Sequence, residues 1–311
     1  MTASDWEILE PRKVPLGGPR AMTVRRTLPQ RRRSFIGAWC FVDHYGPDDV
    51  AVTGGMMLPP HPHTGLQTVS WLFTGTITHA DSTGGRGHIP PGVLSLMTAG
   101  RAITHTEYTT DDTTVLHGVQ LWVALPDAER FVEPGYERYA PEPVTGPGWT
   151  ARVFIGSLLG ETSPAHTFTS LLGAELQLTA GTTLELDVDP RHEHGVLLDT
   201  GTVLVDGSEV TRDELGYHPP GADRLRIEAT ADARLILLGG VPLGESIVMW
   251  WNFIGRDHDE VAAYRANYQT AIGRDEPGAT DTDQFTIVPD ERGNDPLPAP
   301  PLPNGRMRSR S

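Results

Sequence analysis

The chain has 311 residues and a formal net charge of −15, from 25 lysines and arginines against 40 aspartates and glutamates. This length suits about two domains, and the acidic balance argues against a protein that binds nucleic acid through a wholly basic surface. The single cysteine, Cys40, excludes an intrachain disulfide and a cysteine-rich metal cluster.

The composition favours short strands over long helices. The chain contains 34 glycines and 27 prolines, and runs that would form long amphipathic helices are scarce, which is typical of β-sandwiches and β-barrels. The N-terminus has no basic-then-apolar leader, and the longest apolar stretch, around residues 246–255, is too short to cross a bilayer. We therefore expect a cytoplasmic protein with no membrane association.

The first charged feature is the run Arg31-Arg32-Arg33. Such a cluster can contact a polyanion, but arginines of this kind usually pair with acids elsewhere on the fold. We adopt the second interpretation and expect no direct contact with nucleic acid.

Two series of short strands follow, separated by a Pro- and Gly-rich break at residues 133–148. Alternation of polar and apolar residues and the turn residues between the runs predict the strands. Those of the first series are Ala38–Asp43, Gln67–Thr74, Gly92–Met97, Ala102–Tyr108 and Val115–Ala124; those of the second are Leu184–Val188, Gly195–Thr200, Val203–Val205 and Leu235–Leu238.

The strand series and the break define the predicted domains. We assign residues 1–140 to an N-terminal domain, 141–288 to a C-terminal domain, and 289–311 to a flexible Pro/Arg-rich tail. The segment Asp257–Tyr268 is the best helix candidate, with Asp257 as its cap.

Trp250, Trp251 and Phe253 precede this helix. They could be mistaken for a ligand-stacking group, but we interpret them as core residues, because a run of adjacent apolar residues suits a strand buried on both faces.

Two short motifs carry the chemistry. They are His61-Pro62-His63 and His105-Thr106-Glu107. Residues i and i+2 of an extended segment point to the same face, so each motif can direct two ligands into one barrel. If the segments are neighbours, three imidazoles and one carboxylate converge. This set suits one divalent ion, with iron, manganese, nickel, copper and zinc all chemically suitable.

A lone H-x-H motif is weak evidence, and the chain has a second one at His192-Glu193-His194. No H-x-E partner follows it at a useful spacing, so we expect no second metal. His44 next to Asp43 also does not make a catalytic pair, because adjacent residues on a strand face opposite ways.

Several longer motifs resemble the pirin family. His61–Val69 is similar to the signature H-P-H-x-G-h-[EQ]-T-V, and the match continues through Met97–Arg101, His105–Glu107 and His117–Pro126. The resemblance covers about residues 12–126, and more weakly 150–270. It implies an all-β protein made of two cupin domains, which are jelly-roll β-barrels packed together, with a short C-terminal helix.

The resemblance also implies which residues bind the metal. The N-terminal cupin would hold one divalent ion, usually iron, on His61, His63, His105 and Glu107, while the second cupin has lost its site. Gln67 stands where glutamate is frequent, and in pirins the ligating carboxylate comes from the later motif. We predict that Gln67 and His79 lie beside the ligands without binding the metal.

Two classes of function follow from the resemblance. The first is a quercetin 2,3-dioxygenase-like enzyme for a small aromatic substrate, in which Glu107 is both ligand and catalytic base for the substrate hydroxyl. The alternative is a redox-sensing, metal-dependent regulatory protein that binds a transcription factor or a metabolic enzyme. A third option is an enzyme for an unrelated small metabolite. A wide cavity that reaches the metal would favour an enzyme, and a sealed site would favour sensing.

Overall fold

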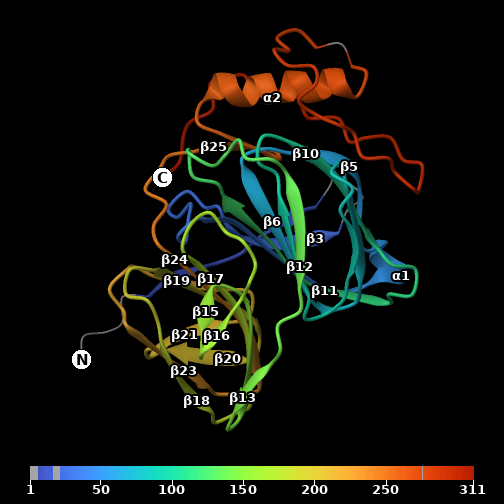
Figure 1. Cartoon of the computed structure of the whole chain (residues 1–311). Coiled ribbons are helices and arrows are strands. Elements are labelled where there is room, and N and C mark those ends of the chain that lie inside the picture. Colours follow the sequence, from blue (N-terminus) through green and yellow to red (C-terminus); the bar gives the residue numbers. More distant parts are fainter. Residues whose placement is uncertain (1–5, 17–21, 275) are drawn as a thin grey trace.

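The computed structural model describes residues 6–16, 22–274 and 276–311. In this part of the chain, two β-barrels pack against each other, and a helix lies over the barrel that carries β5 and β10 (Figure 1). The prediction of an all-β protein with two barrels and a short C-terminal helix is confirmed. Among the described residues, no helix is both long and apolar enough to cross a membrane.

The first barrel combines a seven-stranded sheet, ordered β12-β9-β6-β11-β4-β3-β2, with a four-stranded sheet, ordered β5-β10-β7-β8. Its elements are β2 (Arg12–Pro15), β3 (Thr23–Leu28), β4 (Trp39–Asp49), α1 (Val50–Thr53), β5 (Met57–His63), β6 (Leu66–Thr74), β7 (Ile77–Asp81), β8 (Arg86–Ile89), β9 (Leu94–Thr98), β10 (Ile103–Thr109), β11 (Val115–Ala124) and β12 (Gly135–Tyr139).

The second barrel repeats this plan, with sheets ordered β1-β22-β19-β24-β17-β14-β13 and β18-β23-β20-β21. Its elements are β1 (Glu7–Leu9), β13 (Val144–Gly146), β14 (Trp149–Ile155), β15 (Ser157–Leu158), β16 (Glu161–Thr162), β17 (Leu171–Leu178), β18 (Thr183–Asp187), β19 (Glu193–Thr200), β20 (Thr202–Val205), β21 (Ser208–Thr211), β22 (Leu215–His218), β23 (Arg224–Ala229) and β24 (Ala233–Gly240).

Two segments near the ends of the described chain cross between the barrels, and the predicted domain boundaries stay a prediction. Strand β1 pairs with β22 of the second barrel. After β24 the chain returns to the first barrel as β25 (Val248–Trp250), β26 (Phe253–Gly255) and α2 (His258–Ala271). The tail 289–311 follows, and Leu297 N donates to Pro60 O at 2.8 Å. The tail therefore lies against the first barrel, and its mobility stays a prediction.

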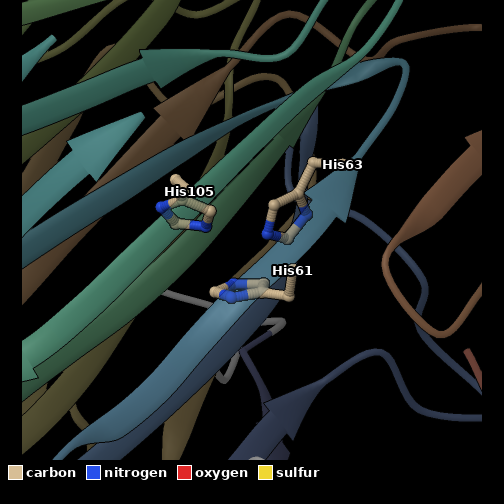
Figure 2. Close-up of side chains that lie close together, drawn as sticks. All are labelled: His61, His63 and His105. Carbon is tan, nitrogen blue, oxygen red and sulfur yellow. The ribbon is translucent and has the colours of Figure 1, made fainter. Parts of the chain in front are cut away.

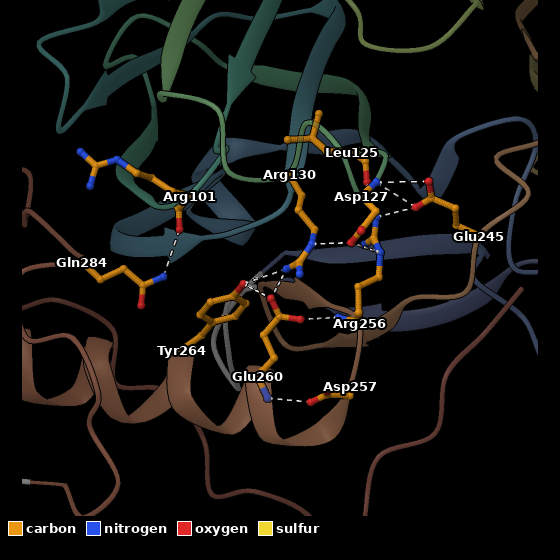
Figure 3. Close-up of polar contacts among 10 residues, drawn as sticks. All are labelled: Arg101, Leu125, Asp127, Arg130, Glu245, Arg256, Asp257, Glu260, Tyr264 and Gln284. Atoms are coloured by element: carbon orange, nitrogen blue, oxygen red, sulfur yellow. Dashed lines mark hydrogen bonds and ion pairs between the residues drawn. The ribbon is translucent and has the colours of Figure 1, made fainter.

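Helix α2 begins where the sequence indicates. The Asp257 carboxylate accepts a hydrogen bond of 2.9 Å from Glu260 N, which satisfies one of the free N–H groups of the first turn. Val261, Tyr264 and Tyr268 are buried on one face, as predicted. The same Glu260 ties the helix to the first barrel, because its carboxylate pairs with Arg130 and accepts from the Tyr264 hydroxyl (Figure 3).

The core packing predicted for Trp250, Trp251 and Phe253 is confirmed, because Phe253 belongs to a buried apolar cluster and both tryptophans pack against it, but the single strand predicted for them is wrong. They do not lie in one strand, because the chain reverses at Trp251, whose φ is 50°, and β25 pairs with β26 as a hairpin. Phe253 is buried, but both tryptophans are only half-buried. A left-handed turn residue is usually glycine or asparagine, so a tryptophan there gives no signal in the sequence.

The two seven-stranded sheets pack against each other through a shared apolar core. Trp71 stacks on Phe154 of the second barrel at a centroid distance of 4.6 Å, and its Nε1 donates to Glu175 at 2.7 Å. The backbones also touch, because a Cβ on Gly37 would lie 2.6 Å from Gly240 Cα. A large, apolar and partly backbone-to-backbone contact fixes the barrels as one unit.

A buried polar group lies in the same interface. Asp199 of β19 accepts from His44 at 2.9 Å and from His117 at 2.6 Å, and pairs with Arg234 at 2.6 Å. Asp43 instead turns away to Arg26. The expectation that Asp43 is no partner of His44 is confirmed, but a partner from the other barrel was missed.

Asp199 is ionised in this network. Burial would raise its pKa, but the hydrogen bonds from His117 and His44 outweigh burial and hold the pKa of that carboxyl well below its usual range. His44, His117 and Asp199 offer ligand atoms within 4.8 Å of one another. Because Arg234 already neutralises the carboxylate, we interpret the group as a charged junction between the barrels and not as a metal site.

Asp199→Asn should lower the free energy of unfolding at pH 7 by on the order of 3 kcal/mol, because it leaves the Arg234 guanidinium without its buried counter-charge. A carboxyl with a depressed folded-state pKa stabilises the fold above its unfolded pKa, about 4, and less as the pH falls below it. The difference from the natural chain should therefore shrink below about pH 4, as measured by denaturant unfolding.

The control is Glu185→Gln, which removes an exposed pair with Arg224 in the same barrel. That change should cost less than about 1 kcal/mol. Equal losses for the two variants would contradict the assignment of Asp199 as a junction between the barrels.

Candidate metal centre

The central strand β10 brings the two predicted motifs together. In its antiparallel pairing, His105 lies opposite His61 of β5 on one side and opposite Asp81 of β7 on the other. Glu107, two residues on, lies opposite His79. Paired residues of an antiparallel sheet share a face, and so do residues i and i+2. All these side chains therefore point into the same barrel.

An irregularity in β5 shapes the same face. The register shifts so that His105 pairs with His61 while Glu107 pairs with Leu58, which leaves one extra residue at Pro59-Pro60. Prolines suit a bulge because they have no N–H to leave unpaired. The bulge brings Leu58 onto the face of Glu107.

Three imidazoles gather at this point. Figure 2 shows His61 and His63 on one strand and His105 on the neighbouring strand, with the rings close together. The centroid distances are 4.2 Å for His61–His105, 5.0 Å for His63–His105 and 5.2 Å for His61–His63. The potential ligand atoms of the three lie within 4.8 Å of one another.

The protonation of these rings fits a metal ligand. His61 Nδ1 lies 2.8 Å from Pro59 O, which can only accept, so the neutral ring has its lone pair on Nε2. Burial lowers the pKa of His61 to about 4 and lowers the pKa values of His63 and His105 well below their usual range. His63 Nδ1 and His105 Nε2 are buried without a hydrogen-bond partner among the described residues, so each has an unused coordinating atom.

Glu107 lies beside this group at 2 % exposure. Its ligand atom, with those of His79 and His105, forms a second set within 4.8 Å. The Ser70 hydroxyl donates to Glu107 Oε1 at 3.0 Å. Burial raises the pKa of the Glu107 carboxyl, although hydrogen bonds from Ser70 and Gln120 oppose this. The two sets share His105, and Glu107 does not group with His61 and His63; imidazole and carboxylate donors of this kind fit a divalent first-row ion.

His79 and Gln67 were both predicted to lie beside the ligands, and they differ in position. His79 Nε2 lies 2.8 Å from Asp81 and its Nδ1 lies 3.4 Å from His105 Nδ1, so His79 is in the cluster. Gln67 is not, because it lies on the opposite face of β6 from Ser70 and its amide donates to Thr98 and to the carbonyl of His166.

The second H-x-H motif has different surroundings. His192 bonds to Ser170 at 2.9 Å, and its ring centroid lies 6.0 Å from that of His194. Within the described residues, these two histidines belong to no group of three ligand-type side chains close enough to hold an ion.

A cavity of about 1090 Å³ reaches His61, His63 and Glu107. Its walls include Phe41 and Trp122, which stack at a centroid distance of 4.1 Å. The remaining lining includes the hairpin tryptophans, Trp250 and Trp251, and residues 308–311 of the tail. This lining was not predicted, because no pattern near the hairpin or the tail indicates that these segments return to the cavity.

Two barrels with this strand order, one carrying a cluster of histidines and a carboxylate in an open cavity, define the two-domain cupins. The chain belongs to the pirin family. Residues 21–123 match the family Pirin, and residues 173–272 match the Pirin C-terminal cupin domain. The family predicted from the motifs is therefore confirmed.

Relatives with assigned names are similar over most of the chain. A Pseudomonas aeruginosa protein named "Putative quercetin 2,3-dioxygenase" is 41% identical over 85% of this chain and 83% of its own length. Human pirin is 30% identical over 68% of this chain and 76% of its own. The crystal structure of quercetin 2,3-dioxygenase from Acinetobacter baumannii matches with a TM-score of 0.88, 35% identity and coverage of 98% and 97% of the two chains.

His105→Ala and Glu107→Ala should each reduce the metal bound per chain by at least about tenfold after loading with ferrous iron and gel filtration. Each removes one of the four predicted metal ligands, and loss of a ligand weakens metal binding. Metal analysis by mass spectrometry measures this loss, and circular dichroism should show that both variants stay folded.

The matched control is His192→Ala in the other H-x-H motif, which should leave the metal content unchanged. Full metal content in both test variants would overturn the ligand assignment.

Proposed function

We propose that this protein is a metal-dependent dioxygenase that oxidises a flavonol such as quercetin or a related hydroxy-aromatic molecule. The observation that carries the proposal is the wide cavity that ends at His61, His63 and Glu107. An open route to the ligand cluster is what a substrate needs and what a purely structural ion does not. The names of the Pseudomonas and Acinetobacter relatives suggest quercetin as the first substrate to test.

We infer that His61, His63, His105 and Glu107 hold one divalent ion, with iron proposed first. When bound, the ion would act as a Lewis acid that lowers the pKa of a substrate hydroxyl and orients the ring. Four protein ligands on an octahedral ion leave two positions for other groups.

Glu107 would also accept the proton of the substrate hydroxyl. Its pKa is raised by burial, and a carboxylate with a raised pKa is a better proton acceptor near neutral pH. Ser70, which donates to the same carboxylate, would hold it in place as the proton arrives. The proton is thereby kept at Glu107, inside the barrel and away from solvent.

The aromatic walls would orient the substrate. Trp122 is T-shaped against His63 at 5.2 Å and stacked on Phe41, so an aromatic wall adjoins the ligand cluster. A planar ring stacked along these walls would present an edge hydroxyl to the cluster and exclude water from it.

The alternative is a redox-sensing regulatory protein that binds a transcription factor or a metabolic enzyme. A metal centre that is closed to solvent would favour that role. A change in the oxidation state of the metal would then act by changing the surface of the protein. The cavity favours the enzyme, and a small-molecule substrate is the partner that we propose.

Iron-loaded protein should consume oxygen when given quercetin, and the rate should fall to background in metal-stripped protein. Glu107→Gln removes both a proposed metal ligand and the proton acceptor, so the turnover rate per bound iron should still fall by about 10²-fold or more. An oxygen electrode measures both effects. His192→Ala is the control and should keep the full rate. No uptake by protein that is shown to hold iron would overturn the quercetin proposal.

A further inference from the structure

Arginines line the outer part of the cavity. They come from both ends of the chain and are Arg12, Arg26, Arg31, Arg308 and Arg310. Among the described lining side chains, the only acidic one is Glu107, which lies at the base with the histidines. The formal net charge of the protein is −15. The mouth of the cavity is therefore rich in positive charge although the protein as a whole is negative.

The arginines differ in whether they already have a counter-charge. Arg26 is fixed by two bonds of 2.7 Å to Asp43 and lies over the Phe41 ring at 4.2 Å. By contrast, Arg12, Arg31, Arg308 and Arg310 form no ion pair with any residue that the structure describes, and of these Arg12 donates to Pro29 O at 2.8 Å. Arg31, Arg308 and Arg310 therefore line the cavity without an acidic partner, and Arg31 and Arg308 are exposed.

Neighbouring arginines outside the cavity are paired. Arg32, next to Arg31, lies 3.2 Å from Glu7, and Arg306, two residues before Arg308, lies 2.7 Å from Asp259. The prediction that the arginine run pairs with acids is thus confirmed for Arg32 and Arg33 but not for Arg31. In both segments, an arginine outside the cavity is paired with an acid, whereas a neighbouring arginine that lines the cavity is not.

The tail is held in place at this point. Arg310 and Ile247 exchange two backbone hydrogen bonds, of 2.8 and 2.9 Å. Ile247 directly precedes β25 and is fully buried, so Arg310 is attached to the hairpin that also carries Trp250. The rim of the cavity is therefore built from the tail, the hairpin and the N-terminal loop.

We propose that the cavity selects a planar hydroxy-aromatic substrate that carries an oxyanion, such as a carboxylate, at the end remote from the reacting hydroxyl. This proposal rests on the proposed function and names its substrate class. The ring would stack along Phe41 and Trp122, its hydroxyl would face Glu107, and the anionic group would lie among Arg31, Arg308 and Arg310. Guanidinium groups bind carboxylates with paired, charge-assisted hydrogen bonds. Several cations at the mouth of a low-dielectric cavity also attract an anion.

The test compares two ligands that differ only in the remote charge, 3-hydroxyflavone and its 4′-carboxylate. Binding to the iron-loaded protein is measured under nitrogen by isothermal titration calorimetry, so that no turnover is needed. We expect the carboxylate to bind about tenfold more tightly at low salt, and the preference to diminish at 0.5 M sodium chloride because screening weakens exposed charge pairs.

Variants locate the source of the preference. Arg31→Ala, Arg308→Ala and Arg310→Ala should each reduce the affinity for the carboxylate by about two- to fivefold and leave the affinity for 3-hydroxyflavone unchanged. The triple variant should lose the preference. Arg32→Ala and Arg306→Ala are matched controls, since each removes an equal charge that lies outside the cavity.

The outcomes separate this proposal from the proposed function. Equal affinity for the two ligands, or equal losses in the test and control variants, would overturn the anionic substrate class even if quercetin drives oxygen uptake. A preference that depends on Arg31, Arg308 and Arg310 would support the class even if no flavonol is oxidised. In that case only the dioxygenase reaction would fail.

Discussion

The position of β10 between β5 and β7 is the constraint on which the rest of the site depends. One strand with period-two alternation brings His105 opposite His61 and Glu107 opposite His79, so a single register aligns every candidate ligand on one inner face. A slip of one residue would turn His105 and Glu107 out of the barrel. The seven-stranded sheet adds Ser70, which fixes the carboxylate from the opposite side.

The second barrel supports this arrangement without contributing a ligand. Its seven-stranded sheet covers the outer face of the strands that carry Ser70, and the close contact of Gly37 with Gly240 and the charged junction at Asp199 fix its position. The side of the first barrel that faces the second barrel is therefore buried. The cavity opens on another side of the first barrel, where the tail and the hairpin meet. A barrel that has no ligand group of its own can still be required for a rigid site.

Local patterns in the sequence were enough to predict the ligand motifs and much of the secondary structure. His61/His63 and His105/Glu107 follow from period-two spacing, and Asp257 follows from the chemistry of a helix cap. Contacts between segments that lie far apart in the sequence could not be predicted. Nothing near His44 indicates that Asp199, 155 residues later, is its partner. Likewise, nothing near Arg310 indicates that it returns to a cavity whose base is formed by β5.

The base and the rim of the cavity are built from parts of the chain that differ in how strongly the fold constrains their residues. The base consists of neutral imidazoles and a carboxylate with a raised pKa on paired strands, where a change in one residue disturbs the sheet as well as the ligand. The rim includes a loop and a tail, whose Arg31 and Arg308 are exposed and form no ion pair with a described residue. Substitutions at the rim therefore cost little stability. Proteins with the same ligand cluster can in this way differ in the charge of the substrates they admit, and the reaction type and the substrate class need not be inherited together.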